Sequence, residues 1–135
     1  MPTLRVTEVN GPKVAAELLI TAAGVMPAVA AITQTYGNIL LARIKANASG
    51  RPGPRIITSN YNRSWNLEMS KHSKGVAADV GTNAVQGRRL EYGFVGSDSL
   101  GRHYSQPPYP HVRPAFDLVA PTYYLAIAAY LEAIT

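Results

Sequence analysis

Apolar residues recur at helical spacing over a long N-terminal stretch. From about residue 13 to residue 48 they are separated by three, four or seven positions: Val14, Leu18, Val25, Val29, Ile32, Tyr36, Leu40 and Ile44. This spacing is typical of one buried face of a helix. Gly24 and Pro27 interrupt it, and a proline removes one backbone hydrogen bond, so we predict a kink or a break between them. A short strand around Leu4, Val6 and Val9 is expected ahead of this helix.

A period of two replaces the helical spacing in the middle of the chain. Trp65, Leu67 and Met69 alternate with polar residues, and alternation resumes over residues 76–80. This pattern is typical of half-buried strands, and residues 71–75 between them suit a hairpin turn. We therefore predict a small antiparallel sheet, with the Trp65 side chain in the core.

Proline and glycine divide the rest of the chain. Residues 49–63 contain Arg51-Pro52-Gly53-Pro54 and are expected to form a linker that ends in one helical turn. A short helix over residues 83–92 should precede a polar loop, residues 93–106, and a stiff extended segment, residues 106–113. Pro114 suits the first turn of a C-terminal helix over residues 114–135, which Pro121 should kink.

These elements predict a single α+β domain over residues 1–135. It would comprise a helical part (1–48), a linker (49–63), a sheet and loop (64–113) and a C-terminal helix (114–135). Hydrophobic residues make up 47% of the chain and charged residues 16%. This balance excludes a disordered chain and suits either a subunit covered by neighbours or an Ala-rich small domain.

The composition also narrows the chemistry. Cysteine is absent, which removes disulfides and thiolate metal sites. We expect no secretory signal, because the N-terminus lacks a charged region followed by an apolar run. We expect no membrane span, because the most apolar stretches are interrupted by charged residues and prolines. His72, His103 and His111 lack the spacing of a metal site, and no serine lies in a nucleophile elbow. We therefore expect no enzyme, no metal and no cofactor.

The net charge of +5 comes from the middle of the chain. Residues 51–113 hold nine of the 13 Lys and Arg residues but only four of the eight acids. Such a segment could face DNA or an acidic partner, or simply be solvated. The candidates for facing DNA are Arg51, Arg55, Lys71 and Lys74. No dense basic run with interleaved aromatic residues is present, so sequence-specific recognition of nucleic acid is not expected.

The order of several short motifs is more specific than any one of them. Val80-Gly81-Thr82, a short helix, Leu90-Glu91-Tyr92-Gly93, a Gly-rich loop, the Pro107-Pro108-Tyr109-Pro110 run and residues 113–117 (RPAFD) follow one another. Thr58, Tyr61 and Ser64 come before them, after the Pro/Gly linker. This arrangement, over residues 50–118, resembles the tail-component family of long-tailed phages, whose members complete the tail and join it to the head.

The resemblance implies a structural virion protein of the phage neck. Its expected partners are further copies of itself in a ring, expected to be a hexamer, the head-completion protein and the tail terminator, with DNA passing non-specifically through the channel. It would be found in the virion, and in the host cytoplasm during assembly. The expected subunit-interface residues are Arg88, Arg89, Glu91, Tyr92, Phe94, Leu100, Tyr104, Tyr109 and Arg113. Glu91 would pair with Arg113 of a neighbour. Two alternatives stay open, the tail terminator itself and a small nucleic-acid-binding module that uses residues 51–113.

Overall fold

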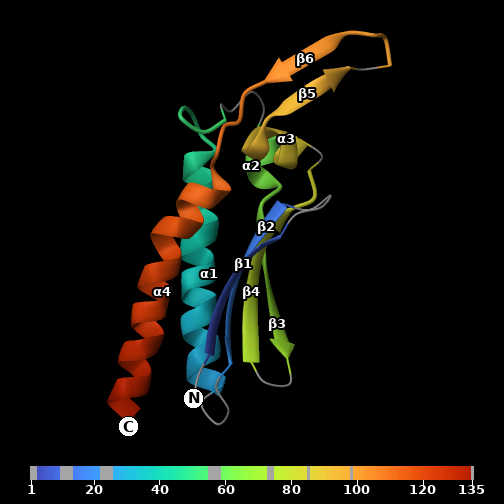
Figure 1. The fold of residues 1–135 in the computed structure, drawn as a ribbon. Coiled ribbons are helices and arrows are strands. Elements are labelled where there is room, and N and C mark those ends of the chain that lie inside the picture. Colours follow the sequence, from blue (N-terminus) through green and yellow to red (C-terminus); the bar gives the residue numbers. More distant parts are fainter. Residues whose placement is uncertain are drawn as a thin grey trace.

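The computed structural model describes residues 3–9, 14–21, 26–54, 59–72, 75–84, 86–97 and 99–134. Side chains are described from residue 27 onward, His72 excepted. The fold is α+β, as the sequence predicts, with helices on one face of an antiparallel sheet (Figure 1).

The main sheet has four antiparallel strands in the order β1-β2-β4-β3. β1 spans Thr3–Val9, β2 Val14–Thr21, β3 Asn66–His72 and β4 Gly75–Thr82. The predicted hairpin of β3 and β4 is confirmed, with Met69 opposite Ala78. The predicted leading strand near the N-terminus is confirmed as β1.

The two long helices are α1, Met26–Asn47, and α4, Val112–Ile134, which run side by side (Figure 1). α1 packs closely on the sheet: a Cβ atom added at Gly37 would lie 2.9 Å from the Cβ of Ala78. Trp65 is only 2% exposed, which confirms its predicted place in the core. The larger side chains of the core are Val29, Leu40, Ile44, Trp65, Val76, Val80, Val112, Phe116, Val119, Tyr123 and Ile127.

The smaller elements gather at one end of the molecule. α2, Asn60–Arg63, leads into β3, and α3, Gln86–Tyr92, follows β4. β5, Phe94–Ser97, and β6, His103–Gln106, pair antiparallel and extend away from the two-layer body (Figure 1). We call this projecting hairpin, residues 94–106, the arm. The predicted irregular loop over residues 93–106 is therefore wrong, because most of it forms two paired strands.

The helix predicted from residue 13 is wrong in its first part, because residues 14–21 form β2. β2 lies between β1 and β4 and pairs antiparallel with both, and its apolar residues Ala16, Leu18 and Ile20 recur with a period of two. A spacing of four residues fits a period of two as well as a helix, which is why the pattern misled. α1 begins at Met26, and Pro27 lies in its first turn, where its missing N–H costs nothing. The predicted break between Gly24 and Pro27 falls mainly on residues 22–25, which lie outside the described residues.

Candidate functional site

The carboxylate of Glu91 binds the first turn of α4 from the end of α3. Its Oε2 accepts the backbone N–H groups of His111 at 2.9 Å and Val112 at 3.0 Å, and its Oε1 accepts that of Arg113 at 3.0 Å. The first N–H groups of a helix have no partner within the helix, and the positive end of its dipole favours an anion. We call this arrangement the clamp. Glu91 is only 3% exposed, so the clamp lies in the interior.

His111 extends the clamp into a chain of buried polar groups. Its Nδ1 lies 2.9 Å from the carbonyl oxygen of Tyr109 and 3.2 Å from Oε2 of Glu91, and its Nε2 lies 2.6 Å from the hydroxyl of Tyr61. Because a carbonyl only accepts, we assign the ring proton to Nδ1, so that Nε2 accepts from the Tyr61 O–H. The Trp65 ring packs edge-on against both Tyr61 and His111.

Burial determines the protonation states of His111 and Tyr61. It lowers the pKa of His111 below the ordinary value of 6.5, while the Tyr109 carbonyl and the Glu91 carboxylate act in the opposite direction. Burial also raises the pKa of the Tyr61 phenol. At neutral pH, His111 and Tyr61 are therefore uncharged.

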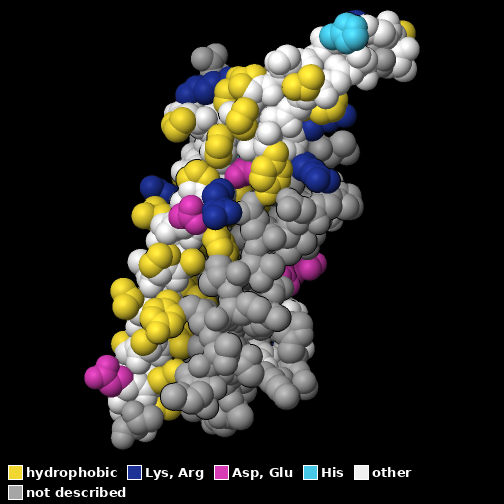
Figure 2. Space-filling view, in the orientation of Figure 1, with side chains coloured by type: hydrophobic (Ala, Val, Ile, Leu, Met, Phe, Trp, Pro, Cys, Tyr) yellow, Lys and Arg dark blue, Asp and Glu magenta, His cyan; other side chains and the backbone are white. Residues whose placement is uncertain are grey.

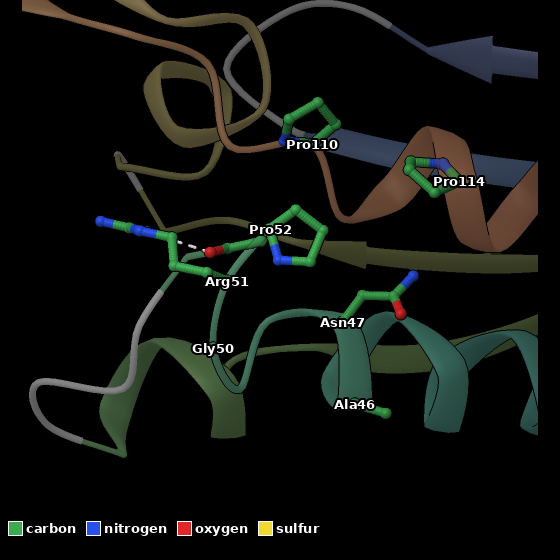
Figure 3. Close-up of a pocket in the computed structure, with 8 residues that line it drawn as sticks. Ala46, Asn47, Gly50, Arg51, Pro52, Pro110 and Pro114 are labelled. Carbon is green, nitrogen blue, oxygen red and sulfur yellow. Dashed lines mark hydrogen bonds between the residues drawn. The ribbon is translucent and has the colours of Figure 1, made fainter.

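A Glu-His-Tyr chain has the order of a catalytic relay, but the polar atoms here are already committed to the chain itself. A hollow of about 170 Å³, which Asn47 and Pro110 help to line, is otherwise lined mainly by proline, glycine and alanine (Figure 3). Arg51 donates to the carbonyl oxygen of Gly53, and its guanidinium lies 3.7 Å over the Tyr109 ring. Asn47 donates to the His111 carbonyl. In the described ranges, no three His, Asp or Glu side chains meet as metal ligands.

Whereas the clamp buries polar groups, the arm exposes apolar ones. Val95 is 81% exposed and Leu100 is 75% exposed, although both are large and apolar. At the base of the arm, the Arg89 guanidinium lies 3.8 Å over the Phe94 ring, and the Gln106 side chain donates to the Arg89 carbonyl. A two-stranded hairpin by itself is only marginally stable in water. Its apolar residues therefore form a surface that the chain itself leaves uncovered.

The predicted interface residues divide into two groups. Glu91 is buried and accepts three backbone N–H groups of its own chain, and the Arg113 side chain lies 3.2 Å from Asp117. The expected ion pair between Glu91 and a neighbour's Arg113 stays a prediction. The others lie on the arm, at its base or near the clamp. Arg88, Arg89, Tyr92, Leu100, Tyr104 and Arg113 are exposed, and Phe94 and Tyr109 are half-buried.

Of the predicted DNA-facing residues, the structure describes Arg51 and Lys71, which lie toward opposite ends of the molecule. Arg51 follows the end of α1 nearest the arm, whereas Lys71 lies near the far end of β3 (Figure 1). Arg55 and Lys74 lie outside the described residues. The Lys and Arg side chains visible in Figure 2 lie instead in the half of the molecule nearest the arm.

His111 and Tyr61 had no assigned role in the sequence analysis, yet they complete the clamp. One signal was available: the start of α4, His111-Val112, has no acid in its first turn. A helix that begins after a proline run without a local cap must find its acceptors elsewhere in the chain.

Comparison of the chain with family models, curated proteins and solved structures found no match. Among the described helices, none has the length and apolarity that crossing a membrane requires.

Proposed function

We propose that this chain is a structural ring subunit of the neck of a long-tailed phage, which completes the tail and joins it to the head around the DNA channel. Support comes first from the motif order given above. The structure adds a physical role for two of those motifs: Glu91 of Leu-Glu-Tyr-Gly holds the backbone that enters Arg113-Pro114. Two motifs that lie apart in the sequence thus both contribute to the clamp.

The observation that carries the proposal is the exposure of apolar side chains on the arm, which lies next to the clamp. Its exposed Val95 and Leu100 are a surface made to be covered, because large apolar side chains gain free energy when a partner removes them from water. Ile39 of α1 and Leu118 of α4, which are 45% and 52% exposed, line a second uncovered apolar strip. A subunit with neighbours on several sides suits both surfaces better than a solitary domain does.

Deletion of residues 96–104 tests the proposal. The deletion removes the tip of the arm but leaves the clamp and the core, so we expect a folded chain. In phage production, that variant should give separate heads and tails instead of joined particles. Fully infectious particles made with the deletion variant would contradict the joining role of the arm.

A matched pair of variants refines the test. Val95→Thr with Leu100→Ser removes the apolar character of the arm, whereas Ser99→Ala changes an exposed polar residue of the same turn. Only the double variant, Val95→Thr with Leu100→Ser, should reduce the joining of heads to tails. A nucleic-acid-binding module would behave differently: the isolated subunit would bind DNA with a steep salt dependence, and the arm variants would bind it normally.

A further inference from the structure

Both outer strands of the main sheet are open. β1 and β3 are the ends of the order β1-β2-β4-β3, so each presents a row of backbone N–H and C=O groups that no described strand pairs with. Open edges invite pairing with another chain, and proteins usually protect them with proline, bulges or very short strands. β3 has seven residues, no proline and a regular register with β4.

Acidic residues occupy three directly opposite register positions across the sheet, and the last of them is on the edge strand β3. Glu17 of β2 lies opposite Asp79 of β4, and Asp79 lies opposite Glu68 of β3. Like charges directly opposite one another destabilise a sheet. Within the described residues, neither Glu68 nor Asp79 has an ion-pair partner. A cation at the next position, beyond β3, would complete this row.

β1 has a cation at the matching position. If β3 pairs antiparallel with β1 of another copy and Arg5 lies opposite Glu68, then Leu4 falls opposite Met69 and Val6 opposite Leu67. The remaining pairs in this register are polar, Thr3 with Ser70 and Thr7 with Asn66. A shift of one residue would set every apolar position against a polar face, and a shift of two would lose the opposite charges.

The strand directions agree with this pairing. Each strand is antiparallel to its neighbour, so β3 runs opposite to β1 within one copy. When copies repeat side by side, β3 of one therefore meets β1 of the next in antiparallel orientation. Met69, 37% exposed at this edge, would be covered by the contact.

We propose that copies of this chain associate edge to edge, with β3 of one copy paired antiparallel with β1 of the next and Glu68 opposite Arg5. The partner is a second copy of the chain, and the contact is heterologous, which closes into a ring when its rotation divides a full turn. This inference rests on the proposed ring function and names the surface that builds the ring. Glu68 also makes the edge selective, because it repels strands with an acidic residue at the opposite position and favours β1, which carries Arg5.

Charge reversal tests the register. Glu68→Arg and Arg5→Glu each place like charges across the contact, so each should weaken self-association of the purified full chain about tenfold or more. Mixing the two variants restores an opposite pair at every contact, and so does combining them in one chain. We therefore expect association to return in both cases, measured as mass against concentration by sedimentation. Lys71→Glu is the control, because Lys71 faces no residue of β1 in this register.

A cross-link provides a second measurement that leaves the charge pair intact. The chain has no cysteine, so Thr7→Cys with Asn66→Cys adds thiols that meet only between copies in the proposed register. Oxidation should give a ladder of linked copies, whereas Thr7→Cys with Ser70→Cys, on the same face but out of register, should not. Circular dichroism verifies that each variant is folded.

The outcomes separate this contact from the proposed function. The edge pairing is overturned if the wild-type chain stays monomeric, or if the Arg5→Glu and Glu68→Arg single variants assemble as well as the wild type. In either case the neck role is still tested by the arm deletion. Association that follows the charge pattern confirms the edge pairing. If images then show open-ended polymers in place of closed rings, the contact stands and the ring function fails.

Discussion

The clamp and the arm are neighbours along the chain, yet they treat polar and apolar side chains in opposite ways. In the clamp, charged and polar groups are buried, and Glu91 satisfies three backbone N–H groups. In the arm, Val95 and Leu100 are left in water. Burial of a polar group costs free energy unless it is fully hydrogen-bonded, whereas exposure of an apolar group forgoes a gain. The first pattern serves the chain's own fold, and the second suits contact with another molecule.

The largest effect is expected where the clamp meets the core. Trp65→Ala should lower the free energy of unfolding by about 3–5 kcal/mol, because it removes a large buried side chain that packs on Tyr61 and His111. Urea titration measures the loss. A loss of less than about 1 kcal/mol would place Trp65 outside the cooperative core.

Removal of the clamp carboxylate should come next. Glu91→Ala leaves three N–H groups at the start of α4 without their charged acceptor and should cost about 2–4 kcal/mol. Asp117→Ala is the matched control, since Asp117 is an exposed acid in an i,i+4 pair on the same helix and should cost less than about 0.5 kcal/mol. Equal losses in the two variants would mean that the clamp contributes no more than a surface pair.

Acid should weaken the clamp by a smaller amount. The folded-state pKa of His111 lies below the ordinary value of 6.5, so below pH 6.5 the unfolded chain binds more protons than the folded chain. The contribution of His111 to stability is therefore constant above pH 6.5. It decreases by up to about 1.4 kcal/mol per pH unit as the pH falls toward the folded-state pKa. Urea titrations between pH 5 and 8 should show this slope, and His111→Asn should flatten it.

The arm should show the smallest effect on stability. Val95→Thr with Leu100→Ser should change the free energy of unfolding by less than about 0.5 kcal/mol, because both side chains are already exposed in the folded chain. Thermal and urea unfolding of the isolated chain measure it. A loss of more than about 1 kcal/mol would show that the arm packs on its own body, and the contrast with the clamp would disappear.

Much of the fold could be predicted from the sequence because the relevant patterns are local. The alternation around Trp65 predicted β3, and helical spacing predicted the helices now seen as α1 and α4. The strand β2 was missed because its place between two other strands, which the local pattern does not reveal, decides whether an apolar run is helix or strand.

The site was harder to predict for a similar reason. Glu91 follows two arginines on a short helix, where an acid is usually solvated. Its burial depends on backbone groups about twenty residues further along the chain, which only the folded arrangement brings within reach. The exposed apolar residues of the arm were visible in the sequence, but the paired strands that carry them were not.

The position of the clamp has a mechanical consequence. The arm leaves the body just after Glu91 and returns just before His111, so the clamp joins the two roots of the arm. A pull on the arm would therefore act on the hydrogen bonds of Glu91, because they join its two roots. The force would then act on α4, whose buried side chains pack in the core from Val112 to Ile127. The arm can thus act as a handle that transmits tension to the longest helix of the molecule and spares the sheet.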